Sequence, residues 1–351
     1  FKGLQKIKVD TLESGDIIAL SGIENINIGD TVSSNDEPDP LPRITVDEPT
    51  VSMYFHVNNG PFAGRDGKYL TSRNISERLD KEILGNVSLQ IKSTDKTDVF
   101  EVCGRGELQM AILIETMRRE GYEFMVSKPQ VITKEENGKL LEPVEHVYLD
   151  IQEEHVGTVT EKLSLRKGKM ANLQNNGFGR AILDFKVPSR GLIGFRSEFL
   201  TDTKGTGIMN TLFDSYKPWF GNIPQRNTGV LIADRPGKIT TYASIAMVDR
   251  GKLFLDVGYE VYTGMVIGER NRTGDLELNI TKEKKLTNMR ASSSDATVTL
   301  RPPINLSLDQ CIEFIAEDEL IEVTPNNIRM RKMELDQNKR ASLKKKMKLN
   351  E

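Results

Sequence analysis

Hydrophobic positions from residue 48 onward recur at two spacings, one typical of strands and one typical of helices. An alternating run is followed by a run at helical spacing, two strand-like runs, a second helical run and a short strand. The predicted order is βαββαβ, which is that of a split βαβ module. The pattern is carried by Val51, Met53, Phe55 and Val57 in the first strand, Ile75, Leu79 and Ile83 in the first helix, and Met110, Leu113, Ile114 and Met117 in the second helix.

The same order occurs a second time along the chain. An alternating run, a helical run, two strand-like runs and a further helical run follow one another. The sequence therefore predicts two tandem ferredoxin-like modules, over residues 48–130 and 139–223. In the second module the strands carry Val147, Leu149, Ile151, Ala181, Leu183, Phe185 and Val187, and the helices carry Val156, Val159, Leu163, Leu192, Phe195 and Phe199.

The regions on either side of the modules are rich in short strands and turns. Residues 1–47 contain β-branched runs between Gly-Asp turns, which predicts the C-terminal part of a β-barrel. Residues 224–351 predict a β-rich domain that ends in a basic helix or tail, and within it Ser307 and Gln310 form a capping box for one helix. The predicted fold class is α+β: a barrel remnant, two ferredoxin-like modules and a β-rich C-terminal domain.

Composition narrows the function classes. The 351 residues carry a net charge of -3, so the chain is not a uniformly basic nucleic-acid binder and any such role depends on local patches. Cys103 and Cys311 lie far apart in apolar runs, which predicts core packing rather than a disulfide or a catalytic thiol. The three histidines lack metal-ligand spacing, and no apolar run reaches the roughly 20 residues that cross a membrane. The expected compartment is the cytoplasm, and the start at Phe1 indicates a fragment.

The glycine-rich stretch at residues 187–210 raises the question of phosphate binding. No Gly-Lys pair in the chain precedes Ser or Thr, so the Walker pattern is absent. Gly191 and Gly194 fit the GXXG pattern of KH loops. The competing interpretation, which we favour, is that Ser189 caps a helix and the glycines let that helix lie close to its sheet. Contact between Arg190 at the helix N-terminus and an RNA phosphate stays open.

The third strand of the second module carries part of an RNA-binding motif. The run "NGFGRAILDF" supplies Gly177, Phe178 and Gly179 of the RNP1 pattern. It places Arg180 and Leu183 where the pattern has aromatic residues that stack on bases. The motif is therefore half complete.

Cationic residues gather in two segments, of which the first is residues 269–291. This segment lacks the apolar alternation that would bury it, which predicts a long exposed loop. Two interpretations stand: the loop contacts RNA phosphates, or it is a solvated loop partly neutralised by its own acids. Its candidate RNA-binding residues are Arg270, Arg272, Lys282, Lys284, Lys285 and Arg290.

The second cationic segment is the end of the chain, counted from Arg329, Arg331 and Lys332 onward. Groups of this kind neutralise phosphates and release counterions, so binding through them falls steeply with salt. The alternative is a solubilising terminus. The candidate RNA-binding residues here are Lys344, Lys345 and Lys346.

Four motifs resemble one protein family. They are "VFEVCGRGELQMAILIETMRREGYEF", "VPSRGLIGFRSEFLTDTKGTGIMN", "KKLTNMRA" and "DELIEVTPNNIRMRKMEL". Together they resemble the C-terminal two thirds of the BipA/TypA family of ribosome-binding translational GTPases, across essentially the whole chain. The two modules resemble domains III and V of elongation factor G more loosely. Cys103 and Gln109 depart from the residues common in the family, in a segment that is scaffold.

The resemblance implies a domain assignment and a function. Residues 1–47 would end the barrel domain II, residues 48–130 and 139–223 would be domains III and V, and residues 224–351 the family-specific C-terminal domain. That domain would dock near the A site of the large ribosomal subunit, where the basic loop contacts rRNA and A-site tRNA. The GTPase domain would precede Phe1, so GTP and Mg²⁺ are expected for the intact protein, and no cofactor, metal or catalytic residue is expected here. We expect a ribosome-associated monomer without membrane contact.

Two other function classes fit the modules by themselves. A free-standing RNA-binding protein would need a complete RNP1 motif or KH loop. A ligand-sensing protein built from paired ferredoxin-like domains would need converging polar groups in a pocket. A GxxxxGK[ST] motif upstream of Phe1 would favour the GTPase assignment over both.

Overall fold

The computed structural model describes residues 7–11, 13–23, 26, 28–33, 40, 42, 48–177, 179–223, 226, 228–284 and 300–350. The chain divides into two compact units, Phe1–Val46 and Asp47–Glu351. In the first unit the described residues form turns and no strand, and Ile17 is 92% exposed. The predicted barrel remnant over residues 1–47 is therefore not found in this described part. A strand forms only when its backbone groups pair with those of a neighbouring strand, and no described residue of this unit belongs to a strand.

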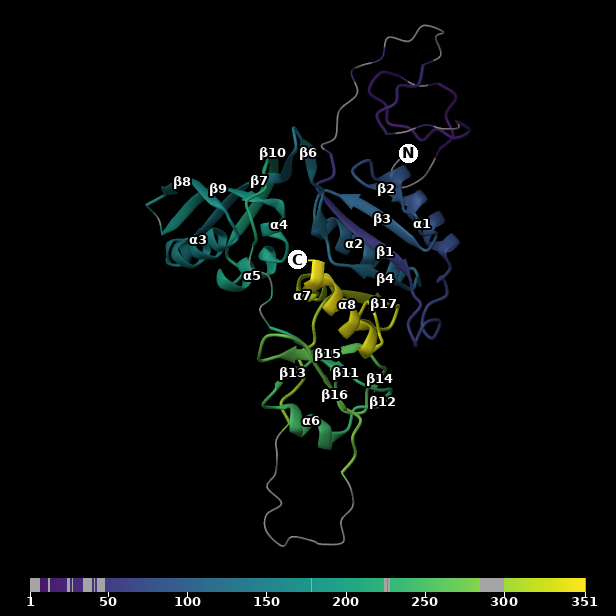
Figure 1. Cartoon of the computed structure of the whole chain (residues 1–351). Coiled ribbons are helices and arrows are strands. Elements are labelled where there is room, and N and C mark those ends of the chain that lie inside the picture. The colour runs from purple at the N-terminus through teal and green to yellow at the C-terminus, as the bar shows by residue number, and fades with distance from the viewer. Residues whose placement is uncertain are drawn as a thin grey trace, which may run out of the picture. The chain divides into compact units, whose positions relative to one another are not determined.

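The first module follows the predicted order. Its elements are β1 (Val51–Val57), α1 (Ser72–Gly85), β2 (Gln90–Ser93), β3 (Val99–Gly104), α2 (Glu107–Arg119) and β4 (Phe124–Ser127). The strands lie in the order β4-β1-β3-β2 and are antiparallel, and both helices pack on the sheet (Figure 1). The alternating positions predicted from the sequence are the core: Met53 and Phe55 are fully buried against Ile75 and Ile114.

The second module repeats this arrangement. Its elements are β7 (Lys139–Gln152), η1 (Glu153–His155), α3 (Val156–Leu165), β8 (Lys169–Asn175), β9 (Arg180–Pro188), α4 (Ser189–Leu192), α5 (Phe195–Asp202) and β10 (Ile208–Pro218). The strand order is β10-β7-β9-β8. The structure differs from the prediction at the glycine-rich stretch, since Pro188 holds the cap position and Ser189 makes no capping hydrogen bond. Two short helices replace the single predicted helix because Gly194, with φ +75°, reverses the chain between them.

Two short strands connect the modules. β5 (Gln130–Val131) pairs with β1 of the first module, and β6 (Lys134–Glu136) pairs with β7 of the second. The connection therefore continues both sheets.

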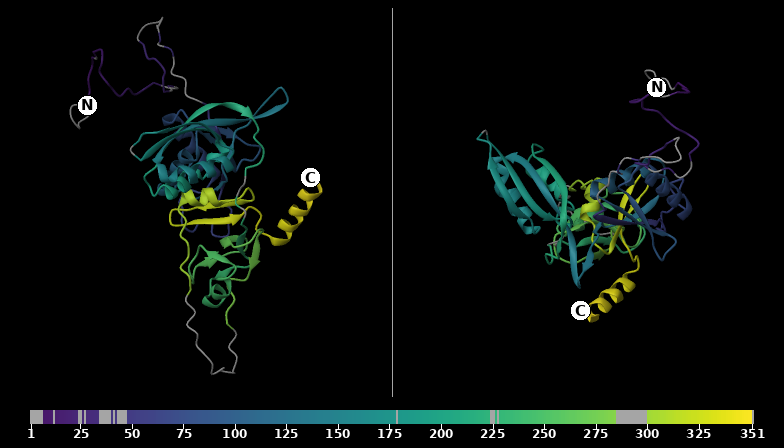
Figure 2. Two further views of the ribbon diagram at one scale, coloured as in Figure 1. Left: turned by 90° about the vertical axis from the view of Figure 1, so that its left-hand side faces the viewer. Right: turned by 90° about the horizontal axis from the view of Figure 1, so that it is seen from above.

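The rest of the chain is rich in short strands. It comprises β11 (Val230–Ala233), β12 (Gly237–Lys238), α6 (Thr241–Met247), β13 (Gly251–Leu253), β14 (Glu260–Val261), β15 (Met265–Arg270), β16 (Leu276–Leu278), α7 (Leu308–Phe314), β17 (Glu319–Val323), β18 (Ile328–Lys332) and α8 (Gln337–Asn350). The predicted capping box is confirmed, with Ser307 and Gln310 bonding each other's backbone N–H at the start of α7. Figure 2 shows α8 standing away from the strands that precede it.

One sheet joins this C-terminal part to the first module. β17 pairs with β4 over four residues, and β18 pairs with β15. Strands of the first module, with β5, and most strands of the C-terminal part therefore form a single sheet of 11 strands. One hydrophobic cluster spans both parts: Phe124 and Val126 of the first module lie in the same core as Ile312 and Ile321. The chain is a mixed α+β structure, and the C-terminal strands share the core of the first module.

Candidate nucleic-acid interface

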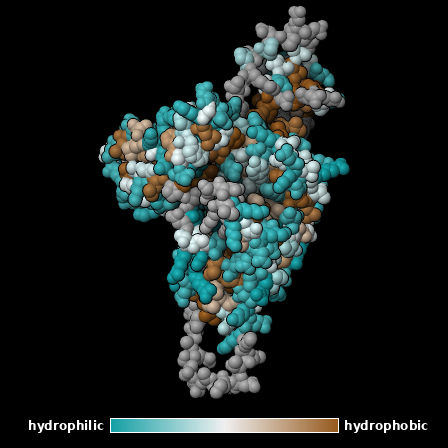
Figure 3. Space-filling view, viewed as in Figure 1, coloured by the Kyte–Doolittle hydropathy of each residue, from teal (hydrophilic) through white to brown (hydrophobic). Residues whose placement is uncertain are grey.

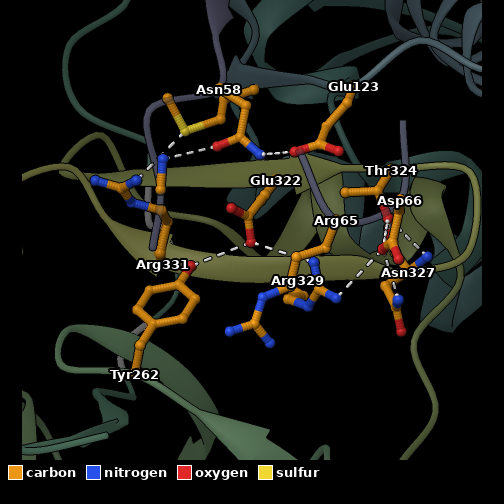
Figure 4. Close-up of polar contacts among 12 residues, drawn as sticks. Asn58, Arg65, Asp66, Glu123, Tyr262, Glu322, Thr324, Asn327, Arg329 and Arg331 are labelled. Atoms are coloured by element: carbon orange, nitrogen blue, oxygen red, sulfur yellow. Dashed lines mark hydrogen bonds and ion pairs between the residues drawn. The ribbon is translucent and has the colours of Figure 1, made fainter. Parts of the chain in front are cut away.

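Buried polar groups fix the C-terminal part to the first module (Figure 4). Asp66, in the loop after β1, accepts hydrogen bonds from Thr324 Oγ1 at 2.7 Å and Asn327 Nδ2 at 2.9 Å, and lies 3.5 Å from Arg329. Burial, the largest single influence, would raise the pKa of Asp66. The hydrogen bonds from Asn327, Thr324 and Asn326, together with the charge of Arg329, outweigh it, so the pKa lies below its usual value. The loop is thereby held on the turn between β17 and β18.

Two fully buried carboxylates lie in the same junction. Glu123 accepts hydrogen bonds from Asn58 Nδ2 at 2.7 Å and from the backbone N–H groups of Gly64 and Gly67, both at 2.9 Å. Glu322 lies 3.5 Å from Arg329 and accepts a hydrogen bond from Tyr262 at 3.2 Å. The partners of Glu123 all belong to the first module and those of Glu322 to the C-terminal part, so each carboxylate fixes the backbone on its own side of the junction. The two sides are joined by the pairing of β17 with β4 and by the contacts of Asp66.

The strand β18 corrects one prediction from the sequence. The charge pattern groups Arg329, Arg331 and Lys332 with the basic tail, but all three are buried in β18. Lys332 lies 2.8 Å from the buried carboxylate of Glu319 and 3.0 Å from Asp318. Arg329 pairs with acids as well, whereas Arg331 donates to the carbonyl oxygens of Lys332 and Met333. All three are buried and are not available to RNA. Sequence charge alone cannot separate such residues from a solvated tail.

The glycine-rich stretch packs against protein. A Cβ atom at Gly191 would lie 2.6 Å from the carbonyl oxygen of Arg166, so the close approach is to the end of α3 rather than to the sheet. Arg190 pairs with the fully buried Glu142 at 2.5 Å and stacks over Trp219, with 3.7 Å from its guanidinium carbon to the ring centroid. The glycines therefore serve close packing, as the favoured interpretation held, but against α3 and Glu313 rather than against the sheet. The guanidinium of Arg190 binds groups of the protein itself.

In the half-complete RNP1 motif, the cation at the first aromatic position is paired with an acid of the same module. Arg180 lies 2.7 Å from Asp150 on the neighbouring strand β7, and Leu183 is buried in the core. Phe178 lies outside the described residues. The two positions where the motif has stacking aromatics therefore serve the module's own structure.

The prediction of one long exposed loop over residues 269–291 is wrong for its described first part, since β16 pairs with β11 and Leu278 and Ile280 are buried. The cations of this segment divide into a structural one and exposed ones. Nη1 of Arg270 donates to the carbonyl oxygen of Gly274 at 2.9 Å, so this guanidinium closes the turn after β15. Arg272, Lys282 and Lys284 are exposed and have no acid partner among the residues described. Lys285 and Arg290 lie outside the described residues. RNA contact by these residues stays a prediction.

The base of this loop is anchored. Thr240, which caps α6, donates its hydroxyl to the carbonyl oxygen of Lys282 at 2.6 Å, and its N–H donates to Ile280 at 3.2 Å. The side chain of Lys282 extends from a fixed backbone position.

The tail cations lie on helix α8. Arg340 is buried, pairs with Glu277 at 2.7 Å and donates to the carbonyl oxygens of Glu334 and Leu335. Lys345 and Lys346 are exposed, and Lys344 lies in the same helix. One buried arginine therefore holds a helix that carries exposed lysines.

Three further exposed cations were not predicted from the sequence. Arg250, Lys252 and Arg301 are exposed and lack an acid partner in the described ranges. The pairing of β13 with β15 brings Arg250 next to Arg272, since the N–H of Asn271 donates to the carbonyl oxygen of Arg250 at 2.9 Å. Arg250 and Lys252 lie about 50 residues before Arg301, so no cationic run in the sequence marks the three residues. The only local signal is the turn at Arg250-Gly251. Figure 3 shows that the visible face of the C-terminal part is mainly hydrophilic.

Other chemistry is not evident in the described part of the chain. No group of three or more His, Cys, Asp or Glu residues there could hold a metal ion, and no described helix is long and apolar enough to span a membrane. The prediction for both cysteines is confirmed, since Cys103 and Cys311 are free and buried. Burial raises the pKa of the Cys311 thiol to about 12 and also raises that of Cys103, so neither is a reactive thiolate.

Comparison with known proteins agrees with this architecture. Residues 228–337 match the TypA/BipA C-terminal domain, and residues 139–227 match the elongation factor G C-terminus. The chain corresponds to the C-terminal region of the BipA/TypA family. The family resemblance inferred from the four motifs is thereby confirmed.

Individual BipA proteins are similar over nearly the whole chain. "Large ribosomal subunit assembly factor BipA" of Escherichia coli (strain K12) is 50% identical over 341 residues, which are 96% of this chain and 56% of that protein. The protein of the same name from Bacillus subtilis (strain 168) is 49% identical over 349 residues, 99% of this chain and 57% of that protein. The one from Haemophilus influenzae is 49% identical over 339 residues. The chain thus spans a little over half the length of these BipA proteins.

Proposed function

We propose that this chain is the ribosome-binding part of a BipA-type translational GTPase and docks on the large ribosomal subunit near its A site. In this proposal residues 224–351 approach the rRNA, and A-site tRNA is a further contact. The name of the relatives, large ribosomal subunit assembly factor, supports the choice of particle. The protein would act in the cytoplasm as a monomer.

The observation that carries the proposal is the division of the cations into buried and exposed sets. Arginines and lysines at the junctions, such as Arg190 and Lys332, are paired with buried carboxylates. Those of the C-terminal part around Arg250, Arg272 and Lys282 are exposed. Exposed cations on a rigid body suit rRNA, because phosphate contacts fix the position of a protein on nucleic acid.

The junction has a mechanical consequence in this proposal. The shared sheet and the hydrogen bonds of Asp66 with Thr324 and Asn327 hold the C-terminal part on the first module. A movement of the first module would therefore be transmitted to the exposed cations. We propose that residues 48–130 act as domain III and 139–223 as domain V, with residues 1–47 belonging to a barrel domain.

In this proposal GTP binding and hydrolysis are activities of the whole protein. The family resemblance implies GTP and Mg²⁺, and the described residues offer no cluster of metal ligands. We assign hydrolysis to a part of the protein outside these 351 residues, and docking to the part described above.

The test is co-sedimentation with purified large ribosomal subunits over a salt series. In the test variant, alanine replaces four loop cations: Lys282, Lys284, Lys285 and Arg290. We expect weaker binding and a flatter plot of log affinity against log salt, with the slope reduced by about one for each phosphate that the loop no longer neutralises. The unfolding midpoint should not change, because Lys282 and Lys284 are exposed.

A matched control removes four exposed lysines elsewhere, so that net charge changes equally. It should retain the slope of the unmodified protein. Sedimentation of the loop variant that equals the unmodified protein at every salt concentration would refute the proposal. The control lysines are Lys81, Lys92, Lys96 and Lys139.

A further inference from the structure

A cleft of about 440 Å³ lies in the C-terminal part, where three segments meet. They are the end of α6, the stretch from β13 to residue 257, and residues 300–304. The N–H of Ile304 donates to the carbonyl oxygen of Leu253 at 2.8 Å, which holds two of the segments together. Most of the wall is apolar and comes from Met247, Val248, Leu253, Val257, Pro302 and Ile304.

The charged lining of the cleft is mainly positive. Lys252 and Arg301 both line it and are exposed, and Arg250 lies two residues before Lys252. One carboxylate, that of Asp256, also lines the cleft and is exposed. The hydroxyl of Ser244 is occupied, since it donates to the carbonyl oxygen of Thr240 at 3.0 Å. An apolar interior with two cations and one carboxylate fits a ligand that has a flat apolar body, an anionic group and a hydroxyl.

The surroundings of the cleft indicate where such a ligand would come from. Helix α6 forms one wall, and its capping residue Thr240 binds the carbonyl oxygen of Lys282 in the predicted rRNA-contacting segment. Arg250 neighbours Arg272 through the hydrogen bond of Asn271. The segments that form the cleft are therefore hydrogen-bonded to the segments that carry the exposed cations of the proposed function.

We propose that this cleft binds one unpaired nucleotide of RNA. The base enters between the apolar walls, Lys252 and Arg301 bind its phosphates, and Asp256 accepts a hydrogen bond from the ribose 2′-hydroxyl. Bases in a duplex are stacked and cannot enter such a cleft, whereas unpaired bases can be splayed out. This inference rests on the proposed function and specifies it: the contact is to a loop, bulge or end of RNA.

The first experiment measures binding of the 351-residue chain to a fluorescent single-stranded RNA of ten uridines, and to the same strand annealed to its complement. The unmodified protein should prefer the single strand. Val257→Trp fills the cleft from a position that is 44% exposed, and should weaken single-strand binding by about fivefold or more, since it excludes one base from the apolar walls. Val257→Ala, the control, should bind like the unmodified protein.

A second variant does not depend on filling the cleft. Lys252→Ala with Arg301→Ala removes two exposed cations, and should lower the slope of log affinity against log salt by about 1.4 for the single strand. Replacing the uridines with deoxyuridines should weaken binding to the protein, and Asp256→Ala, which removes the acceptor, should remove that preference for RNA.

Three results would overturn the inference: equal affinity for single strand and duplex, unchanged single-strand binding by Val257→Trp, or an unchanged salt slope for the double alanine variant. Failure of this inference can be told apart from failure of the proposed function. If the loop variant loses large-subunit binding while Val257→Trp binds the single strand normally, the cleft is refuted and the docking role stands. If the loop variant sediments normally at all salt concentrations, the docking role itself fails.

Discussion

The backbone N–H of Gly194 donates a hydrogen bond of 2.9 Å to Oε2 of Glu107, which joins the two modules. Burial raises the pKa of Glu107 to about 7, the Gly194 N–H opposes this shift, and the Glu313 carboxyl on α7 adds to it. Asp309 on α7 raises the pKa further and Arg166 at the end of α3 lowers it. Arg196 and Ser197 of α5 line a small cleft together with Glu107.

The raised pKa of Glu107 predicts that the free energy of unfolding falls as pH rises. The folded-state pKa of Glu107 is raised from its ordinary 4.5 to about 7, so its contribution is complete below about pH 4.5 and lost as pH rises through 7. Glu107→Gln stays neutral and should raise the unfolding free energy at pH 8 by on the order of 1 to 3 kcal/mol relative to the unmodified protein. Urea unfolding at pH 5 and pH 8 measures this.

The matched control is Glu161→Gln, since Glu161 is exposed on α3. It should leave the difference in unfolding free energy between the two pH values unchanged. A Glu107→Gln protein with the same pH dependence as the unmodified chain would contradict the prediction.

The pair of Arg190 and Glu142 predicts a large loss of stability. Arg190→Ala takes the guanidinium away from the fully buried Glu142 carboxylate, which keeps a hydrogen bond from the N–H of Phe220 at 2.7 Å. Breaking a buried ion pair from one side costs roughly 3 kcal/mol or more. Urea unfolding should show that loss for Arg190→Ala and almost none for Arg196→Ala, since Arg196 is exposed. Normal stability with weakened RNA binding would instead support a phosphate contact at Arg190.

The pair of Arg340 and Glu277 predicts that α8 can be released without unfolding the rest. Arg340→Ala should increase amide hydrogen exchange across residues 337–350, because it removes the 2.7 Å ion pair that holds the helix. Lys339→Ala removes the same charge from an exposed position and should leave exchange unchanged.

If the lysines of α8 contribute to ribosome binding through their position, Arg340→Ala weakens co-sedimentation more than Lys339→Ala. Equal exchange in both variants would show that the ion pair does not hold α8.

The sequence by itself determined the local elements of this protein. Alternation at Met53 and Phe55, helical spacing at Val159 and Leu163, and the capping box at Ser307 each predicted an element that the structure contains. These signals are local, because a strand or helix shows its buried face in residues two to four positions apart. The resemblance to BipA was likewise readable from contiguous motifs.

Only the tertiary structure decided which charges are available to a partner. Arg190, Arg329 and Lys282 look alike in a sequence, yet the first two neutralise buried carboxylates and the third is exposed. The pairing of β4 with β17 links positions about 200 residues apart, and the cleft between α6 and Ile304 forms in a similar way. Burial and pairing depend on which distant segments pack together, and neither charge nor periodicity along the chain records that.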